Sequence, residues 1–122
     1  MLLFVYGTLK RGCKNHHVME SGHTPFLANA TTTGTLINLG PFPGFKRDGG
    51  LTIHGELFSV SDAFLRRADR FEGVPTMYTR EEIQVRTEAG QYEMAYVYEV
   101  TDETIQSYRA GNRVIPSGIW VE

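Results

Sequence analysis

Glu72 stands where a carboxyl group could take up and return a proton. It follows an expected helix, Ser61 to Phe71, and is followed at once by Gly73. A carboxylate at this end of a helix faces the negative pole of the helix dipole, which costs about 0.3–1 kcal/mol. The same field and the apolar residues nearby would raise the pKa of Glu72 toward neutrality, where a general acid and base works best. Spacing alone also allows a solvated surface glutamate paired with an arginine.

A second candidate site is the turn that follows the first apolar segment. The run from Leu2 to Tyr6 ends abruptly at Gly7, and two cations, Lys10 and Arg11, follow closely. Main-chain N–H groups that pass from a strand into a glycine turn can form a nest for an anion. The sequence equally allows a plain tight turn in which Gly7 has a positive φ. The glycine patterns of phosphate-binding and dinucleotide-binding loops are absent.

Tyr78 and Arg80 lie two positions apart on an expected strand, so their side chains share one face. They could line a pocket beside Glu72, or they could form a pair on the protein surface. The sequence leaves both possibilities open.

The other chemically active side chains form no recognisable site. His16, His17, His23 and His54 lack the spacing typical of metal ligands, so we expect no metal and no cofactor. Cys13 is the single cysteine, which excludes an internal disulfide and a cysteine-rich zinc site. Basic neighbours would lower its pKa. Because no partner base can be identified, we expect an incidental loop residue rather than a nucleophile.

Composition and length restrict the class of protein. The 122 residues fit one domain, 1–122, and 41% hydrophobic with 21% charged residues is typical of a globular chain. A net charge of -2 and the lack of a basic stripe argue against a nucleic-acid partner. The first apolar run breaks at Gly7, too early for a signal peptide or a membrane span. We therefore expect a soluble, cytoplasmic protein without a membrane partner.

The elements that position the candidate residues follow from apolar spacing and turn residues. Proline and glycine predict turns at 40–44 and 48–50, and Gly34 predicts a bulge or bend. Ser61 is a suitable N-cap. The expected strands are 2–6, 26–39, 51–60, 78–86 and 92–100, the expected helices are 15–20, 61–71 and 102–109, and 114–122 closes the chain.

The segment from 51 to 60 is apolar on both faces. Ile53 and Leu57 alternate with polar residues, while Phe58 and Val60 occupy the opposite phase. This pattern is typical of a barrel wall backed by helices, and together with the order of elements it predicts an α+β barrel.

Three segments resemble the γ-glutamylcyclotransferase-like, or AIG2-like, family. The first, FVYGTLKRG with the following Asn15-His16, is most similar to its γ-glutamylamine cyclotransferase members. The second, Asp69-Arg-Phe-Glu to Tyr78-Thr-Arg80, resembles the family pattern D-x-F-E followed by P-x-x-Y-x-R. The third and weaker match is Ser117-Gly-Ile-Trp120. The resemblance thus spans the chain.

This resemblance implies a small mixed β-barrel with flanking helices and a pocket at its mouth. It implies Glu72 as catalytic acid and base, and a substrate site formed by Tyr6, Gly7, Thr8 and Leu9, with Tyr78 and Arg80 as further candidates. The implied reaction converts a small γ-glutamyl amine, such as γ-glutamyl-lysine, to 5-oxoproline and the free amine. The alternatives are a barrel that binds such a compound without converting it and a different amide-processing enzyme on the same scaffold. The segment 41–50 could shape the rim that selects the amine, or it could be an ordinary mobile loop.

Overall fold

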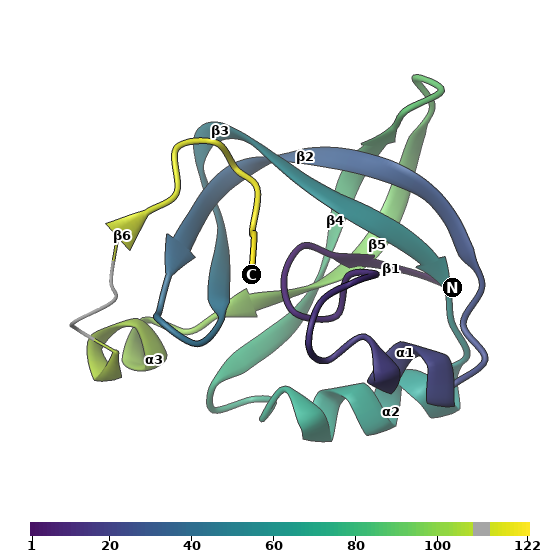
Figure 1. The fold of residues 1–122 in the computed structure, drawn as a ribbon, viewed down its shortest axis with the longest axis horizontal. Helices are drawn as coiled ribbons and strands as arrows, with labels where there is room; N and C mark the ends of the chain where they lie inside the picture. Colours follow the sequence, from purple (N-terminus) through teal and green to yellow (C-terminus); the bar gives the residue numbers. More distant parts are fainter. Residues whose placement is uncertain (109–112) are drawn as a thin grey trace.

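Five strands close into a mixed β-barrel in the computed structural model, which describes residues 1–108 and 113–122 (Figure 1). Two helices, α1 and α2, lie side by side along one side of the barrel, and α3 lies at one end. The elements are β1 (Leu2–Val5), α1 (His17–Ser21), β2 (Phe26–Asn38), β3 (Pro43–Ser59), α2 (Asp62–Phe71), β4 (Tyr78–Thr87), β5 (Tyr92–Val100), α3 (Asp102–Ser107) and β6 (Arg113–Val114).

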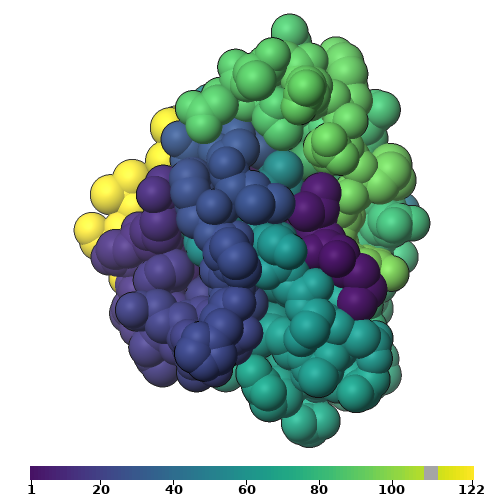
Figure 2. Space-filling view, turned by 90° about the vertical axis from the view of Figure 1, so that its right-hand side faces the viewer, coloured from purple at the N-terminus to yellow at the C-terminus, as the bar shows by residue number. Residues whose placement is uncertain are grey.

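The barrel closes because β1 bridges two strands that are far apart in sequence. It pairs antiparallel with β3 and parallel with β5, and β4 and β5 form an antiparallel hairpin. β2 pairs with both β3 and β4, which completes the ring, and the short β6 adds to the edge of β2. The expected α+β mixed barrel with flanking helices is therefore confirmed. In Figure 2 the tip of the β4–β5 hairpin projects at the top, away from the helices at the bottom.

Strands with two apolar faces hold two hydrophobic layers apart. On β1, Phe4 belongs to the cluster inside the barrel, whereas Leu3 and Val5 belong to the cluster between the barrel and the helices. On β3, Ile53 and Leu57 point to the inner cluster and Phe58 to the outer one, as the sequence indicated.

Helix α2 ends in a way that fixes the place of Glu72. The Ser61 hydroxyl caps its first turn by accepting a hydrogen bond from the Phe64 N–H at 3.0 Å. Glu72 is the C-terminal cap residue, and Gly73 follows with φ of +70°, a left-handed conformation that stops the helix. On α2, Phe64, Leu65 and Ala68 are buried, whereas Phe71 is 48% exposed.

The structure differs from the sequence expectation chiefly in β3, which begins at Pro43 rather than near residue 51. The expected turn at 48–50 lies inside this strand as a bulge, because Gly34 pairs with Leu51 while Thr35 pairs with Lys46. A bulge at Gly34 was expected. The turn between β2 and β3 is also shorter than predicted, since Asn38 already pairs with Pro43.

The remaining differences concern helix ends and the closing segment. The first helix begins at His17 instead of residue 15, and the last ends at Ser107; Arg109, in the predicted helix, lies outside the described residues. Beyond β6, the closing segment is irregular and bonds to β3 through the Gly118 carbonyl, which accepts from the His54 N–H at 2.9 Å. No helix in the described parts of the chain has the length and apolarity needed to span a membrane.

Candidate active site

A cavity of about 180 Å³ lies between the turn after β1 and the carboxyl end of α2. One ordered water needs roughly 10–15 Å³ of such space, so the cavity suits a small organic molecule. Of the residues that the sequence selected, six line it: Tyr6, Gly7, Thr8, Leu9, Glu72 and Tyr78. Two segments more than 60 positions apart thus form one site. Glu72 carries the single formal charge among the described lining residues.

The turn after β1 is braced on its carbonyl side. The Asn15 N–H donates to the Thr8 carbonyl oxygen at 3.0 Å, and the Asn15 side-chain amide donates to the Thr8 hydroxyl, also at 3.0 Å. The His16 ring Nδ1 lies 2.8 Å from the Leu9 carbonyl oxygen, as a donor. Asn15 and His16 therefore fix the turn from the start of α1.

The N–H side of the same turn carries no such partners. Within residues 1–108 and 113–122, the main-chain N–H groups of Gly7, Thr8 and Leu9 donate no hydrogen bond to the protein. Successive free N–H groups at a cavity wall can bind an oxygen anion. Gly7 does not have a positive φ, so the turn does not need a glycine here for its backbone conformation, which was one alternative that the sequence allowed. A Cβ at position 7 would lie 2.7 Å from Pro43 Cγ, so close approach of the turn to Pro43 requires the glycine.

Glu72 has an electrostatic environment suited to proton exchange. Its side chain is partly covered by the cavity wall, and this burial raises the pKa of Glu72 from 4.5 to about 7. The direction is the one expected from the sequence. Burial accounts for it, whereas the sequence argument also invoked the helix dipole.

Three tyrosines lie near Glu72, and the hydroxyl group of each already donates a hydrogen bond to another protein group. Burial is the main cause that raises the pKa of Tyr6, Tyr78 and Tyr98, and the nearby Glu72 carboxylate adds to the effect. The Tyr6 hydroxyl donates to the Tyr98 carbonyl oxygen at 2.7 Å, and the Tyr78 hydroxyl donates to the Pro43 carbonyl oxygen at 2.9 Å. These groups stay neutral and fixed, which leaves proton transfer to Glu72.

Arg80 lies outside the cavity lining. Its guanidinium donates from Nε and Nη2 to the two carboxylate oxygens of Asp69, at 2.8 and 3.1 Å, and lies 4.7 Å from the centre of the Tyr96 ring. Arg80 therefore contacts the helix that carries Glu72 rather than the cavity itself.

Several lining residues were not selected from the sequence. Asn15 had a local signal, since it directly follows the glycine turn, and Phe71 and Met77 flank the segment of Glu72. Tyr98 has no local signal, because only closure of the barrel brings β5 to the site. The lining residues that no sequence prediction placed at the site are Phe4, Val5, Asn15, Phe71, Met77 and Tyr98, whereas Phe42 and Pro43 belong to the segment 41–50 that the sequence offered as a rim.

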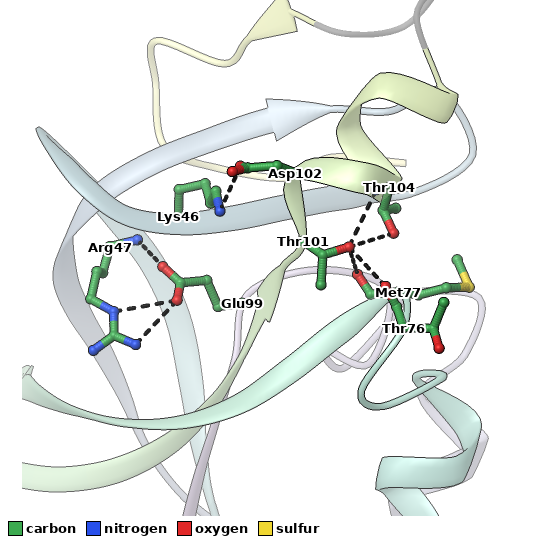
Figure 3. A network of polar contacts seen from close by, with 8 residues as sticks. All are labelled: Lys46, Arg47, Thr76, Met77, Glu99, Thr101, Asp102 and Thr104. Atoms are coloured by element: carbon green, nitrogen blue, oxygen red, sulfur yellow. Dashed lines mark hydrogen bonds and ion pairs between the residues drawn. The ribbon is translucent and has the colours of Figure 1, made fainter.

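The connection between α2 and β4 is fastened to the end of β5. The Thr101 hydroxyl lies 2.8 Å from the Thr76 carbonyl oxygen, and the Thr101 N–H donates to the Met77 carbonyl oxygen at 3.1 Å (Figure 3). In the same region the Arg47 guanidinium pairs with Glu99, so the start of β3 is tied to β5. The segment 41–50 is thus mainly ordered strand, and Phe42 and Pro43 reach the cavity.

Among the described residues, no group of three or more His, Cys, Asp or Glu side chains is arranged to hold a metal ion. Cys13 is partly buried, and burial raises the pKa of its thiol, opposite to the lowering suggested by its basic neighbours.

Comparison with known proteins agrees with this fold. The family model described as γ-glutamyl cyclotransferase, AIG2-like, matches residues 3–122. A putative γ-glutamylcyclotransferase of Vibrio cholerae is 32% identical over 123 residues, covering 99% of this chain and 96% of the relative. γ-Glutamylaminecyclotransferase of Rattus norvegicus is 39% identical over 93 residues, covering 69% of this chain and 62% of the relative.

A solved structure shares the architecture closely. The crystal structure of an AIG2-like protein from Mus musculus has a TM-score of 0.80 at 29% identity, covering 99% of this chain and 94% of that chain. Together with the family model, this match leaves one assignment: the chain belongs to the AIG2-like γ-glutamyl cyclotransferase family.

Proposed function

We propose that this protein converts a γ-glutamyl amine, such as γ-glutamyl-lysine, to 5-oxoproline and the free amine, with Glu72 as general acid and base. The observation that carries the proposal is the juxtaposition of the Glu72 carboxyl with the free N–H groups of the turn in one cavity. Relatives named as cyclotransferases support this class of reaction.

The reaction needs one proton carrier and no protein nucleophile. Glu72 takes a proton from the substrate's α-ammonium group, and the resulting amine attacks the γ-carbonyl carbon. A carbon–nitrogen bond closes the five-membered ring, and the bond to the leaving amine breaks. At this stage the ring nitrogen gives up its second proton. The leaving amine takes both protons, the first of them through Glu72, and departs as an ammonium ion. A pKa of about 7 places Glu72 where both transfers are feasible at neutral pH.

The turn and the tyrosine wall would supply orientation. Ring closure is intramolecular, and well-oriented reactions of this kind reach effective molarities of about 10⁵–10⁸ M. The free N–H groups of Gly7, Thr8 and Leu9 suit an oxygen anion, either the substrate's α-carboxylate or the oxyanion that forms during attack. Fixed hydroxyls of Tyr6 and Tyr78 keep this wall rigid.

The composition of the cavity favours an amine over an α-amino acid as leaving group. Phe42, Phe71 and Met77 line it, and no cation does so among the described residues. An α-amino acid would bring a carboxylate next to the breaking bond, and that charge would lose hydration without gaining a partner. An alkyl amine has no such cost. A lysine joined through its ε-amine keeps its carboxylate several carbons away.

A panel of γ-glutamyl compounds tests the proposal. We expect 5-oxoproline and free amine, measured by mass spectrometry, from γ-glutamyl-ε-lysine and γ-glutamyl alkyl amines, and far less from γ-glutamyl α-amino acids. Glu72→Gln should lower the rate of product formation by about 10²–10⁴-fold, whereas Glu93→Gln, a change at an exposed glutamate, should behave as the native chain. Thermal stabilisation by these compounds without product would instead indicate a binding protein of the same fold.

A further inference from the structure

The ion pair between Asp69 and Arg80 links the elements that carry the site, although neither residue lines the cavity. Asp69 lies one helical turn before Glu72 on α2, where residues three apart are neighbours. Its Oδ1 accepts hydrogen bonds from Arg80 Nε and from the Tyr98 hydroxyl, each at 2.8 Å, and its Oδ2 accepts from Arg80 Nη2 at 3.1 Å. One carboxylate thus joins α2 to both β4 and β5.

This link continues to the substrate turn. Tyr98 lines the cavity, and its main-chain carbonyl oxygen accepts the hydrogen bond from the Tyr6 hydroxyl. On the helix side, the Asp69 carbonyl oxygen accepts from the Val74 N–H at 2.9 Å, which closes the turn that contains Glu72. The Asp69 side chain therefore stands between the two halves of the site, although it does not line the cavity.

The pair is partly covered, so its two charges depend on each other. The side chains of Asp69 and Arg80 are 22% and 24% exposed. A charge left without its partner at such depth acts strongly on its neighbours, because solvent screens it only in part.

The other groups around Glu72 would not mask such a charge. Tyr6, Tyr78 and Tyr98 are held neutral by burial, from the β1, β4 and β5 sides. On α2, the arginines Arg66, Arg67 and Arg70 are exposed to solvent. Glu99, which lies beyond Tyr6, is paired with Arg47.

We propose that Asp69 and Arg80 are positioning residues for Glu72: together they fix the end of α2 and present a neutral neighbour to its carboxyl group. The expected effect on kcat rests on the proposed function, whereas the expected effect on the titration of Glu72 does not. It gives a role to Asp69 and Arg80, the first and last residues of the segment that resembles the family pattern. Neither of them lines the cavity.

The pair predicts opposite effects when each partner is neutralised. Asp69→Asn leaves the Arg80 cation alone, which favours the Glu72 carboxylate and lowers its titration midpoint. Arg80→Gln leaves the Asp69 anion alone, which favours the protonated form and raises the midpoint. On a helix, the Cβ atoms of residues three apart lie about 5–6 Å from each other. A unit charge at about 6 Å, screened by an effective dielectric constant between 20 and 80, would move the midpoint by about 0.5–2 pH units. The double variant should return close to the native value.

The experiment is an NMR titration of the full chain labelled with ¹³C at the glutamate carboxyls, with Glu72→Gln to assign the signal. This measurement reads Glu72 whether or not the protein turns over a substrate. Asp62→Asn and Arg66→Gln are the matched controls, because they neutralise an exposed ion pair two turns earlier on the same helix. They should leave the midpoint in place.

The result that overturns the proposal is an unmoved midpoint in both single variants, or movement in the same direction. Arg80→Lys keeps the positive charge but loses the pair of hydrogen bonds to Asp69. It should leave the Glu72 titration midpoint unchanged and lower kcat. If Asp69→Asn does not fold, Arg80→Lys and Arg80→Gln test the proposal in its place. If the native protein formed no 5-oxoproline from the panel of γ-glutamyl compounds, the proposed enzyme function would be refuted. The positioning role of Asp69 and Arg80 would still be decided by the titration.

Discussion

Replacing Glu72 by glutamine is expected to stabilise the protein at alkaline pH. The pKa of Glu72 is about 7 in the folded chain and 4.5 for an ordinary glutamate. Between these values the folded chain binds the proton more tightly than the unfolded chain does, so stability falls as the pH rises through this window. Above pH 7 the fold carries the whole cost of an ionised, poorly hydrated carboxylate. Glutamine has nearly the same shape and never ionises.

The size of the effect follows from the separation of the two pKa values. At about 1.36 kcal/mol per unit, the native chain loses about 3 kcal/mol at pH 8 relative to the glutamine variant, and only about 0.8 kcal/mol at pH 5. A gain of this size would be large against a typical total stability of about 5–15 kcal/mol.

Urea unfolding at pH 5 and pH 8, followed by circular dichroism, measures the difference. Glu93→Gln provides the control, because Glu93 is exposed and its replacement should leave the midpoints unchanged at both pH values. The reasoning would be refuted if Glu72→Gln were no more stable than the native chain at pH 8, or if its advantage did not grow between the two pH values.

Three further predictions concern activity and stability. Glu72→Gln should lower turnover by about 10²–10⁴-fold, and the native kcat/KM should rise with pH to a plateau with a midpoint near 7, the pKa of Glu72; a flat profile in rate assays would contradict its role as base. Gly7→Ala should weaken 5-oxoproline binding in calorimetry, because the new methyl group would lie 2.7 Å from Pro43 Cγ and displace the turn; unchanged affinity would show that the turn does not need this close approach. Ser61→Ala removes the N-cap hydrogen bond of α2 and should cost about 0.5–2 kcal/mol in urea unfolding, without moving the pH midpoint of activity.

Much of the site could be predicted because its two main parts are local in sequence. The turn at Gly7 and the glutamate at the end of α2 each have a signature within a few residues. Their meeting in one cavity depends on the barrel, which the apolar pattern on both faces of the strands indicated. The same logic explains why Tyr98 was missed: its place in the wall arises from the parallel pairing of β1 with β5.

The differences between prediction and structure concern residues whose local structure or contacts depend on partners far away in the sequence. Gly49 and Gly50 suggested a turn, but pairing with β2 absorbs them as a bulge within β3. Arg80 was grouped with Tyr78 because the two share a strand face. The structure turns its guanidinium to Asp69, a partner eleven positions earlier that strand periodicity cannot reveal.

The central place of β1 has a mechanical consequence. Leu2–Val5 has a bonded strand on each edge and an apolar layer on each face, so its amide hydrogens reach solvent only when the barrel itself opens. The turn at Gly7 continues directly from this strand. We therefore expect the binding surface to keep its shape until the whole fold is lost, so that heat inactivation and global melting coincide.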